Sequence, residues 1–256
     1  MNTFSSALIG SLLAGLATAV GALPIFFKKN YSKTFINFAM GVSAGIMLVA
    51  SFVSLLLPGI EQADLIYPSG KAFFVVLLGL FVGYFFIIGI HEILPHEHMV
   101  KANDGPDTKS ISRVFLIVLA ITIHNFPEGL SVGVGFGSTD SSNAIALALA
   151  IAAQNVPEGL IIAFGLVSEG APRWKAFLIS LASGLVEPVA AVLGFASTQI
   201  ARASLPVAFG FAAGAMLFVV CQEIFPELFR EGREKMATFG VILGIVSMVA
   251  LDHFLG

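Results

Sequence analysis

Two copies of one short motif hold the residues whose types and spacing could do chemistry. The copies are 124–130 (HNFPEGL) and, thirty residues later, 154–160 (QNVPEGL). Each copy is surrounded by apolar residues, with no Lys or Arg beside it. A charged group at the centre of a membrane helix costs roughly 2.5 to 3.5 kcal/mol on insertion scales. An ionisable residue inside a membrane segment is therefore a hypothesis of function by default.

Helical spacing brings the polar residues of each copy together. Residues three and four apart share a helix face, so His124 neighbours Glu128, and Gln154 and Asn155 flank Glu158. His124 lies roughly 18 Å along its segment from one surface, and Gln154 roughly 16 Å along from the other. We therefore expect two antiparallel helices to present an imidazole, two carboxylates and three carboxamides to each other near the midplane. The third carboxamide is that of Asn125.

A proline precedes the glutamate in both copies. Pro127 and Pro157 have no N–H, so the carbonyls of Ile123 and Ala153 lose their usual helical partners. Broken helices that line a cavity offer such oxygens to ions. The alternative is an ordinary proline kink stabilised by packing.

Glu187 adds a third carboxylate within an apolar segment, while Glu223 and Glu92 lie nearer the ends of theirs. These segments contribute no basic residue at similar depth. Clustered carboxylates without a protein cation must hold protons or bind a cation from solution. The mixed nitrogen and oxygen ligand set suits Zn²⁺, Fe²⁺, Mn²⁺ or Co²⁺ better than Cu⁺, which prefers sulfur. The sequence predicts a midplane divalent-metal site, in which shared carboxylates could bridge two ions.

Several further residues are weaker candidates for metal contacts. Met47 is either a thioether ligand or ordinary packing in an apolar helix. His91 lines an inner exit or simply packs, and His96 and His98 form a His-x-His pair that is either metal-binding or solvated. Glu223 is a candidate on the same exit route.

The composition is that of a membrane protein. Of 256 residues, 57% are hydrophobic and 11% charged, whereas soluble domains carry about 25% charged residues. We expect an all-α polytopic membrane protein made of one transmembrane domain, residues 1–256, because lipid leaves no other way to satisfy the backbone of such segments. The eight expected transmembrane segments are 4–27, 35–57, 72–94, 112–136, 143–167, 174–197, 203–225 and 237–255.

The distribution of Lys and Arg predicts the orientation. Among the 13 basic residues, all but Lys71 and Arg202 fall in the loops on one side. By the positive-inside rule that side is cytoplasmic, so both termini are extracytoplasmic. The short loops and the absence of a targeting extension favour a bacterial inner membrane.

A second internal sequence similarity links segments 35–57 and 203–225. Residues 43–48 (SAGIML) resemble 212–217 (AAGAML), and Pro58 and Pro226 follow. The arrangement would then be 3+2+3, with the last three helices an inverted copy of the first three, as in transporters. The alternative is that small residues and Met recur wherever helices pack closely.

At these motifs the sequence resembles the ZIP (Zrt/Irt-like protein) family of metal transporters, most closely its bacterial GufA-like branch. The motifs are H-N-F-P-E-G, Q-N-V-P-E-G, the E-P pair at Glu187 and the S-A-G-I-M-L run. The resemblance covers essentially the whole chain. It implies eight helices, both termini outside, and uptake of divalent metal, chiefly Zn²⁺, into the cytoplasm.

The resemblance also implies a ligand set for two adjacent metal positions. The first would use His124, Glu128, Gln154 and Glu158, with Met47 close by. The second would add Asn125, Asn155 and Glu187, with both motif glutamates bridging. Where the family often has His-Asp or His-Asn, this chain has Gln154-Asn155. The resemblance further implies that segments 4–27, 112–136, 143–167 and 174–197 move as an elevator, often within a homodimer.

The leading hypothesis is a secondary transporter of Zn²⁺, with Cd²⁺, Fe²⁺, Mn²⁺ and Co²⁺ as further substrates. Binding would strengthen as pH rises, because the glutamates lose protons when metal binds. One alternative is an intramembrane zinc hydrolase, although no His-Glu-x-x-His motif is present. Another is a proton-coupled transporter that uses the same carboxylates without metal. We expect no enzyme activity, no prosthetic group and no nucleic-acid partner; the partners are divalent metal ions and the lipid bilayer.

Overall fold

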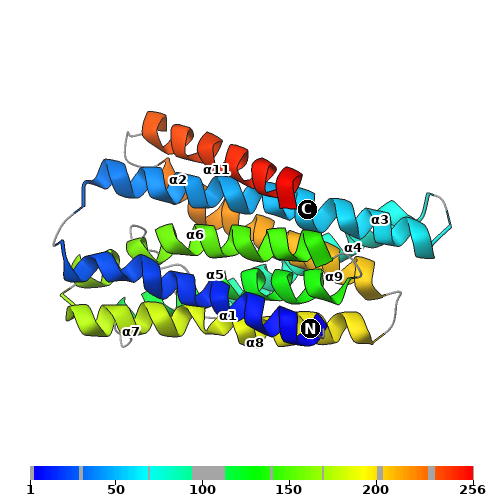
Figure 1. The fold of residues 1–256 in the computed structure, drawn as a ribbon, viewed down its shortest axis with the longest axis horizontal. Helices are drawn as coiled ribbons and strands as arrows, with labels where there is room; N and C mark the ends of the chain where they lie inside the picture. Colours follow the sequence, from blue (N-terminus) through cyan, green and yellow to red (C-terminus); the bar gives the residue numbers. More distant parts are fainter. Residues whose placement is uncertain are drawn as a thin grey trace.

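The computed structural model describes residues 3–28, 31–68, 70–93, 113–138, 141–168, 170–200, 204–229 and 234–255. Every regular element in these ranges is a helix, which confirms the all-α prediction. The helices lie side by side as a bundle of antiparallel spans (Figure 1).

Within the described ranges, eight spans follow one another, several of them built from consecutive helices. The first four spans are α1 (Thr3–Ala22) with η1 (Leu23–Phe26), α2 (Lys33–Ala50) with η2 (Ser51–Leu56) and α3 (Leu57–Ile66), α4 (Ala72–Ile93), and α5 (Arg113–Gly137). The last four are α6 (Ser141–Ser168), α7 (Arg173–Gly184) with α8 (Val186–Gln199), α9 (Leu205–Val219) with η4 (Val220–Ile224) and α10 (Phe225–Leu228), and α11 (Glu234–Leu255).

The spans have the length and composition of membrane helices. Seven of them are long and apolar enough to cross a bilayer, and α5, with 25 residues, exceeds the about 20 that a crossing needs. Large apolar side chains such as Leu13, Phe74 and Val189 point outward, each more than half exposed. The prediction of a polytopic membrane protein is therefore confirmed, and the two chain ends lie toward the same end of the bundle (Figure 1).

Prolines shape the helices differently from the expectation. The second span continues through Pro58 to Ile66, well past the predicted end at 57, because the π-helical turn η2 precedes the proline. A π-helical turn, η4, likewise precedes Pro226. A π-turn shifts the hydrogen-bond register, which accommodates a residue that cannot donate.

The prolines of the two motifs do not break their helices, and the break lies in another span. Both α5 and α6 run on as α-helices through Pro127 and Pro157, so neither motif breaks its helix. The predicted segment 174–197 is instead two helices, separated at Leu185. Pro188 lies in the first turn of α8, where its missing N–H costs no hydrogen bond. Glu187 therefore stands at a helix start.

Backbone contacts at glycines divide the bundle into two blocks. The site block comprises α1, α5, α6, α7 and α8; the flanking block comprises α2, η2, α3, α4, α9, η4, α10 and α11. Among the described glycines, each one whose added Cβ would overlap backbone of another helix faces a helix of its own block. Examples are Gly133 against Ala191 in the site block and Gly45 against Gly244 in the flanking block. Side chains rather than interlocked backbones fill the space between the blocks.

The same pairings reveal the inverted repeat. In the flanking block α2 packs along α11 through facing glycines, and α9 packs along α4 through glycines that contact the backbone of larger residues. In the site block α1 packs along α6, and α8 along α5. If the first three spans are exchanged in order with the last three, and α5 with α6, the pair α2–α11 becomes the pair α9–α4. The pair α1–α6 likewise becomes the pair α8–α5. The predicted 3+2+3 arrangement is thus present in the packing, together with its matched η2 and η4 turns.

Candidate metal centre

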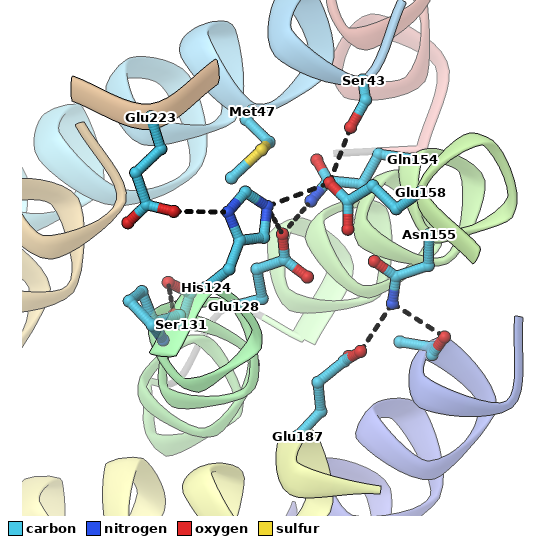
Figure 2. A network of polar contacts seen from close by, with 12 residues as sticks. Ser43, Met47, His124, Glu128, Ser131, Gln154, Asn155, Glu158, Glu187 and Glu223 are labelled. Carbon is cyan, nitrogen blue, oxygen red and sulfur yellow. Dashed lines mark hydrogen bonds and ion pairs between the residues drawn. The ribbon is translucent and has the colours of Figure 1, made fainter. Parts of the chain in front are cut away.

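The antiparallel helices α5 and α6 bring the two motifs face to face. His124, Glu128 and Glu158 each offer a ligand atom, and these atoms lie within 4.8 Å of one another. Glu128 is fully buried and Glu158 is 9% exposed. Figure 2 shows one ring nitrogen of His124, Nε2, facing both Glu128 and Glu158.

Each carboxylate of the centre receives one neutral donor. The Gln154 amide donates to Glu128 Oε1 at 2.7 Å, and the Ser43 hydroxyl donates to Glu158 Oε1 at 2.7 Å. The Asn155 amide donates to Glu187 Oε1 at 2.6 Å and to the carbonyl of Ala14 at 2.9 Å. These donors fix where the carboxylates point and leave part of each group's capacity unused.

Several buried oxygens of the centre have no hydrogen-bond partner among the described residues. They are Glu128 Oε2, Gln154 Oε1, Asn155 Oδ1, Glu187 Oε2 and Asn125 Oδ1. A buried acceptor left unpaired costs about 1–3 kcal/mol, and more when it is charged. This is an oxygen-rich interior that a cation would satisfy.

The spacing of the ligand atoms suits a small divalent cation. His124 Nε2 lies 3.2 Å from Glu158 Oε1 and 3.5 Å from Glu128 Oε1. Zinc bonds of about 2.0–2.2 Å place tetrahedral ligands roughly 3.4 Å apart. The three groups therefore need little movement to close on one ion.

Two predicted residues approach the centre from the flanking block. Met47 on α2 is fully buried, and its thioether lies beside the imidazole (Figure 2). Glu223 on η4 reaches toward the same ring, with Oε2 3.7 Å from His124 Nδ1. Although Glu223 was predicted nearer the cytoplasmic end of its span, its long side chain meets the cluster.

The remaining predicted residues divide into two groups. Asn125 and Glu187 are buried in the site block, and Glu187 joins the cluster through Asn155 rather than by direct contact with His124. His96 and His98 lie outside the described residues. His91 belongs to α4, but its side chain is likewise outside the description.

Sequence reasoning missed two contributors, Ser43 and the carbonyl of Ala14. A signal for Ser43 was available, because it precedes Met47 by four residues and so shares its helix face. No side-chain signal could mark Ala14, since its contribution is a backbone oxygen.

The fold and the centre together define the class of protein to which this chain belongs. An eight-span bundle with an inverted repeat, and buried carboxylates converging on one imidazole halfway along the spans, is the architecture of a membrane transporter for cations.

The chain belongs to the ZIP zinc transporter family. A family model described as "ZIP Zinc transporter" matches residues 90–252. The chain is 38% identical over 250 residues to the zinc transporter GufA of Myxococcus xanthus, covering 97% of this chain and 98% of that one. It is 41% identical over 251 residues to the zinc transporter ZIPB of Bordetella bronchiseptica (98% and 81%). It is also 32% identical over 332 aligned positions to human zinc transporter ZIP11 (98% and 97%).

These relatives confirm the resemblance seen in the motifs. Because they are named transporters, the protein is a transporter rather than an enzyme, and the hydrolase alternative has no support.

Proposed function

We propose that this protein carries Zn²⁺ into the cytoplasm through the centre formed by His124, Glu128 and Glu158. The observation that supports this is the convergence of their ligand atoms within 4.8 Å, buried inside the bundle. Two carboxylates and one imidazole supply the charge and the nitrogen and oxygen ligands that Zn²⁺ accepts. Cd²⁺, Fe²⁺, Mn²⁺ and Co²⁺ share this ligand chemistry and are proposed as weaker or competing substrates.

Gln154 and Met47 complete the first ion position in this proposal. The free Gln154 Oε1 is a further oxygen ligand, and the Met47 thioether favours softer ions such as Cd²⁺. Asn125, Asn155 and Glu187 supply oxygens for a second, adjacent position, in which Glu128 and Glu158 bridge. Glu223, and beyond it His91, His96 and His98, would receive the ion on its way to the cytoplasm.

The two blocks suggest how the centre is exposed alternately to the two sides. The ligands on α5, α6 and α8 belong to the site block, whose helices interlock through glycines. Sliding of the site block along the flanking block, the elevator motion, would carry the ion across while both blocks stay intact. We further propose that residues 1–256 form one transporter domain with both termini outside the cytoplasm. The protein would lie in a bacterial inner membrane as a homodimer.

The direct test is uptake by proteoliposomes containing purified protein. Glu128→Ala and Glu158→Ala are each expected to reduce the initial rate of Zn²⁺ uptake to the level of empty liposomes, because an essential ligand is lost. Competition by Cd²⁺, Mn²⁺ and Fe²⁺ would rank the substrates.

Glu234→Ala is the matched control, since it removes an exposed carboxylate from the first turn of α11. It should transport like the wild type. Wild-type transport by either centre variant would reject the assignment.

A further inference from the structure

The three carboxylates of the centre are held by donors from two different blocks. Gln154 and Asn155, which hold Glu128 and Glu187, lie on α6 with the site block. Ser43, which holds Glu158, lies on α2 with the flanking block. Only the Glu158 bond among these three therefore crosses from one block to the other (Figure 2).

Ser43 is placed so that its hydroxyl serves the carboxylate directly. The residue is 1% exposed, and its Oγ lies 2.7 Å from Glu158 Oε1. The same oxygen faces His124 Nε2 at 3.2 Å. Ser43 thus orients the carboxylate oxygen that points to the imidazole, which is one of the atoms that would bind the ion.

The bond is sensitive to the relative position of the blocks. A hydrogen bond is lost beyond a donor–acceptor distance of about 3.5 Å, so a relative shift of only about 1–2 Å separates Ser43 from Glu158. The donors of Glu128 and Glu187 travel with their acceptors and keep their bonds.

We infer that Ser43 is a positioning residue for Glu158, and that its hydrogen bond makes cation affinity depend on the position of the two blocks. This inference rests on the proposed function. While the blocks lie as they do here, Glu158 is oriented toward His124 and the cation is held tightly. When the site block slides, Glu158 loses the Ser43 hydroxyl while Glu128 and Glu187 keep their amide donors, and the cation is held more weakly. The movement of the site block is thereby coupled to release of the cation.

The inference predicts a change in KM rather than in the maximal rate. Outer partners that orient metal ligands typically change affinity or activity by about 10–100-fold. Ser43→Ala should raise the KM for Zn²⁺ uptake about 10-fold and leave Vmax within about twofold. A reduced metal-dependent rise in the Tm of the purified protein should accompany it.

Ser51→Ala is the matched control on the same span. Ser51 is also buried, but its hydroxyl donates at 2.8 Å to the carbonyl of Met47 within its own span. Its KM should stay at the wild-type value. An equal rise in both variants would show a general packing effect and overturn the inference, as would a wild-type KM in Ser43→Ala.

The isosteric pair Ser43→Thr and Ser43→Val separates the hydroxyl from the volume of the side chain. Threonine keeps the donor and should retain a KM near the wild type, whereas valine should behave like alanine. Equal KM values for the pair would overturn the inference even if Ser43→Ala failed to fold.

Failure of the inference is distinguishable from failure of the proposed function. If Glu158→Ala abolishes uptake and Ser43→Ala has no effect, the centre stands and the role of Ser43 is rejected. If Glu158→Ala transports normally, the proposed function itself is rejected.

Discussion

At the scale of residues, the centre combines full burial with negative charge. Glu128 and Glu187 are buried, and each accepts one amide hydrogen bond from α6. Neutral amides stabilise a carboxylate without cancelling its charge, so the centre keeps its attraction for a cation. A Lys or Arg in place of Gln154 or Asn155 would cancel one of these negative charges and weaken that attraction.

Asn155 offers a sharp test, because its amide donates to both Glu187 and the carbonyl of Ala14. Asn155→Asp replaces the donor that reaches Glu187 and Ala14 with a second carboxylate facing Glu187. In a chelator the variant should be less stable than wild type by about 1–3 kcal/mol, since two buried hydrogen bonds are lost. Added Zn²⁺ should raise its Tm more than that of the wild type, because the cation offsets the repulsion.

Thermal unfolding in detergent, with chelator and with Zn²⁺, measures both effects. Gln199→Glu adds the same charge at an exposed position of α8. It should change neither the stability in chelator nor the rise in Tm with Zn²⁺. An Asn155→Asp protein as stable as the wild type in chelator would contradict the described hydrogen bonds.

At the scale of elements, glycines set how closely the site helices approach. Gly129 lies one residue after Glu128, and an added Cβ there would overlap the backbone carbonyl of Glu187. The start of α8 therefore packs directly on α5, which brings the third carboxylate to the centre. The break at Leu185 makes this possible, because it lets the α8 helix begin beside the motif.

Gly129→Ala should consequently push α8 away from α5. We expect a loss of stability of about 1–3 kcal/mol, as for other overpacked sites, together with reduced Zn²⁺ uptake because Glu187 is displaced. Tm in detergent and uptake in proteoliposomes measure the two outcomes.

Gly89→Ala is the control for this prediction. A Cβ at Gly89, in the helix α4, would meet nothing within 4 Å. The variant should be neutral or stabilised by up to about 1 kcal/mol, because alanine favours helix more than glycine does. Equal destabilisation by both substitutions would mean that close α5–α8 packing is unimportant.

At the scale of the whole molecule, the two blocks differ in how they are held. Within each block, helices interlock at glycines; between the blocks, contacts run through side chains, including Ser43 to Glu158 and His124 to Glu223. Interlocked backbones resist sliding, whereas a side-chain surface permits it.

A disulfide within the site block should therefore be compatible with transport. In a Cys221→Ser background, Gly135→Cys and Ala144→Cys would join α5 to α6, because a Cβ at Gly135 would lie 3.6 Å from that of Ala144, a spacing that a disulfide accepts. The oxidised protein should retain Zn²⁺ uptake within about twofold of the reduced protein. Uptake that disappears on oxidation and returns on reduction would show that α5 and α6 move against each other.

The sequence by itself determined the membrane class, the helical spans, the doubled motif and the ligand chemistry. These depend on local properties: hydropathy over about 20 residues, helical spacing, and the cost of a charge in lipid. His124 and Glu128 were predictable as neighbours for this reason, and the antiparallel order of short-looped spans placed Glu158 opposite them.

Only the tertiary structure decided which side chains from distant spans complete the centre. Ser43 is more than a hundred residues from Glu158 in the sequence, and Glu223 is about a hundred residues from His124. Their approach depends on how each helix is rotated and packed. The helix break at Leu185 and the π-turns before Pro58 and Pro226 were likewise settled by packing, because a proline alone permits a kink, a break or a shifted register. Rotation, depth and register are properties of helices in contact, and a single sequence does not fix them.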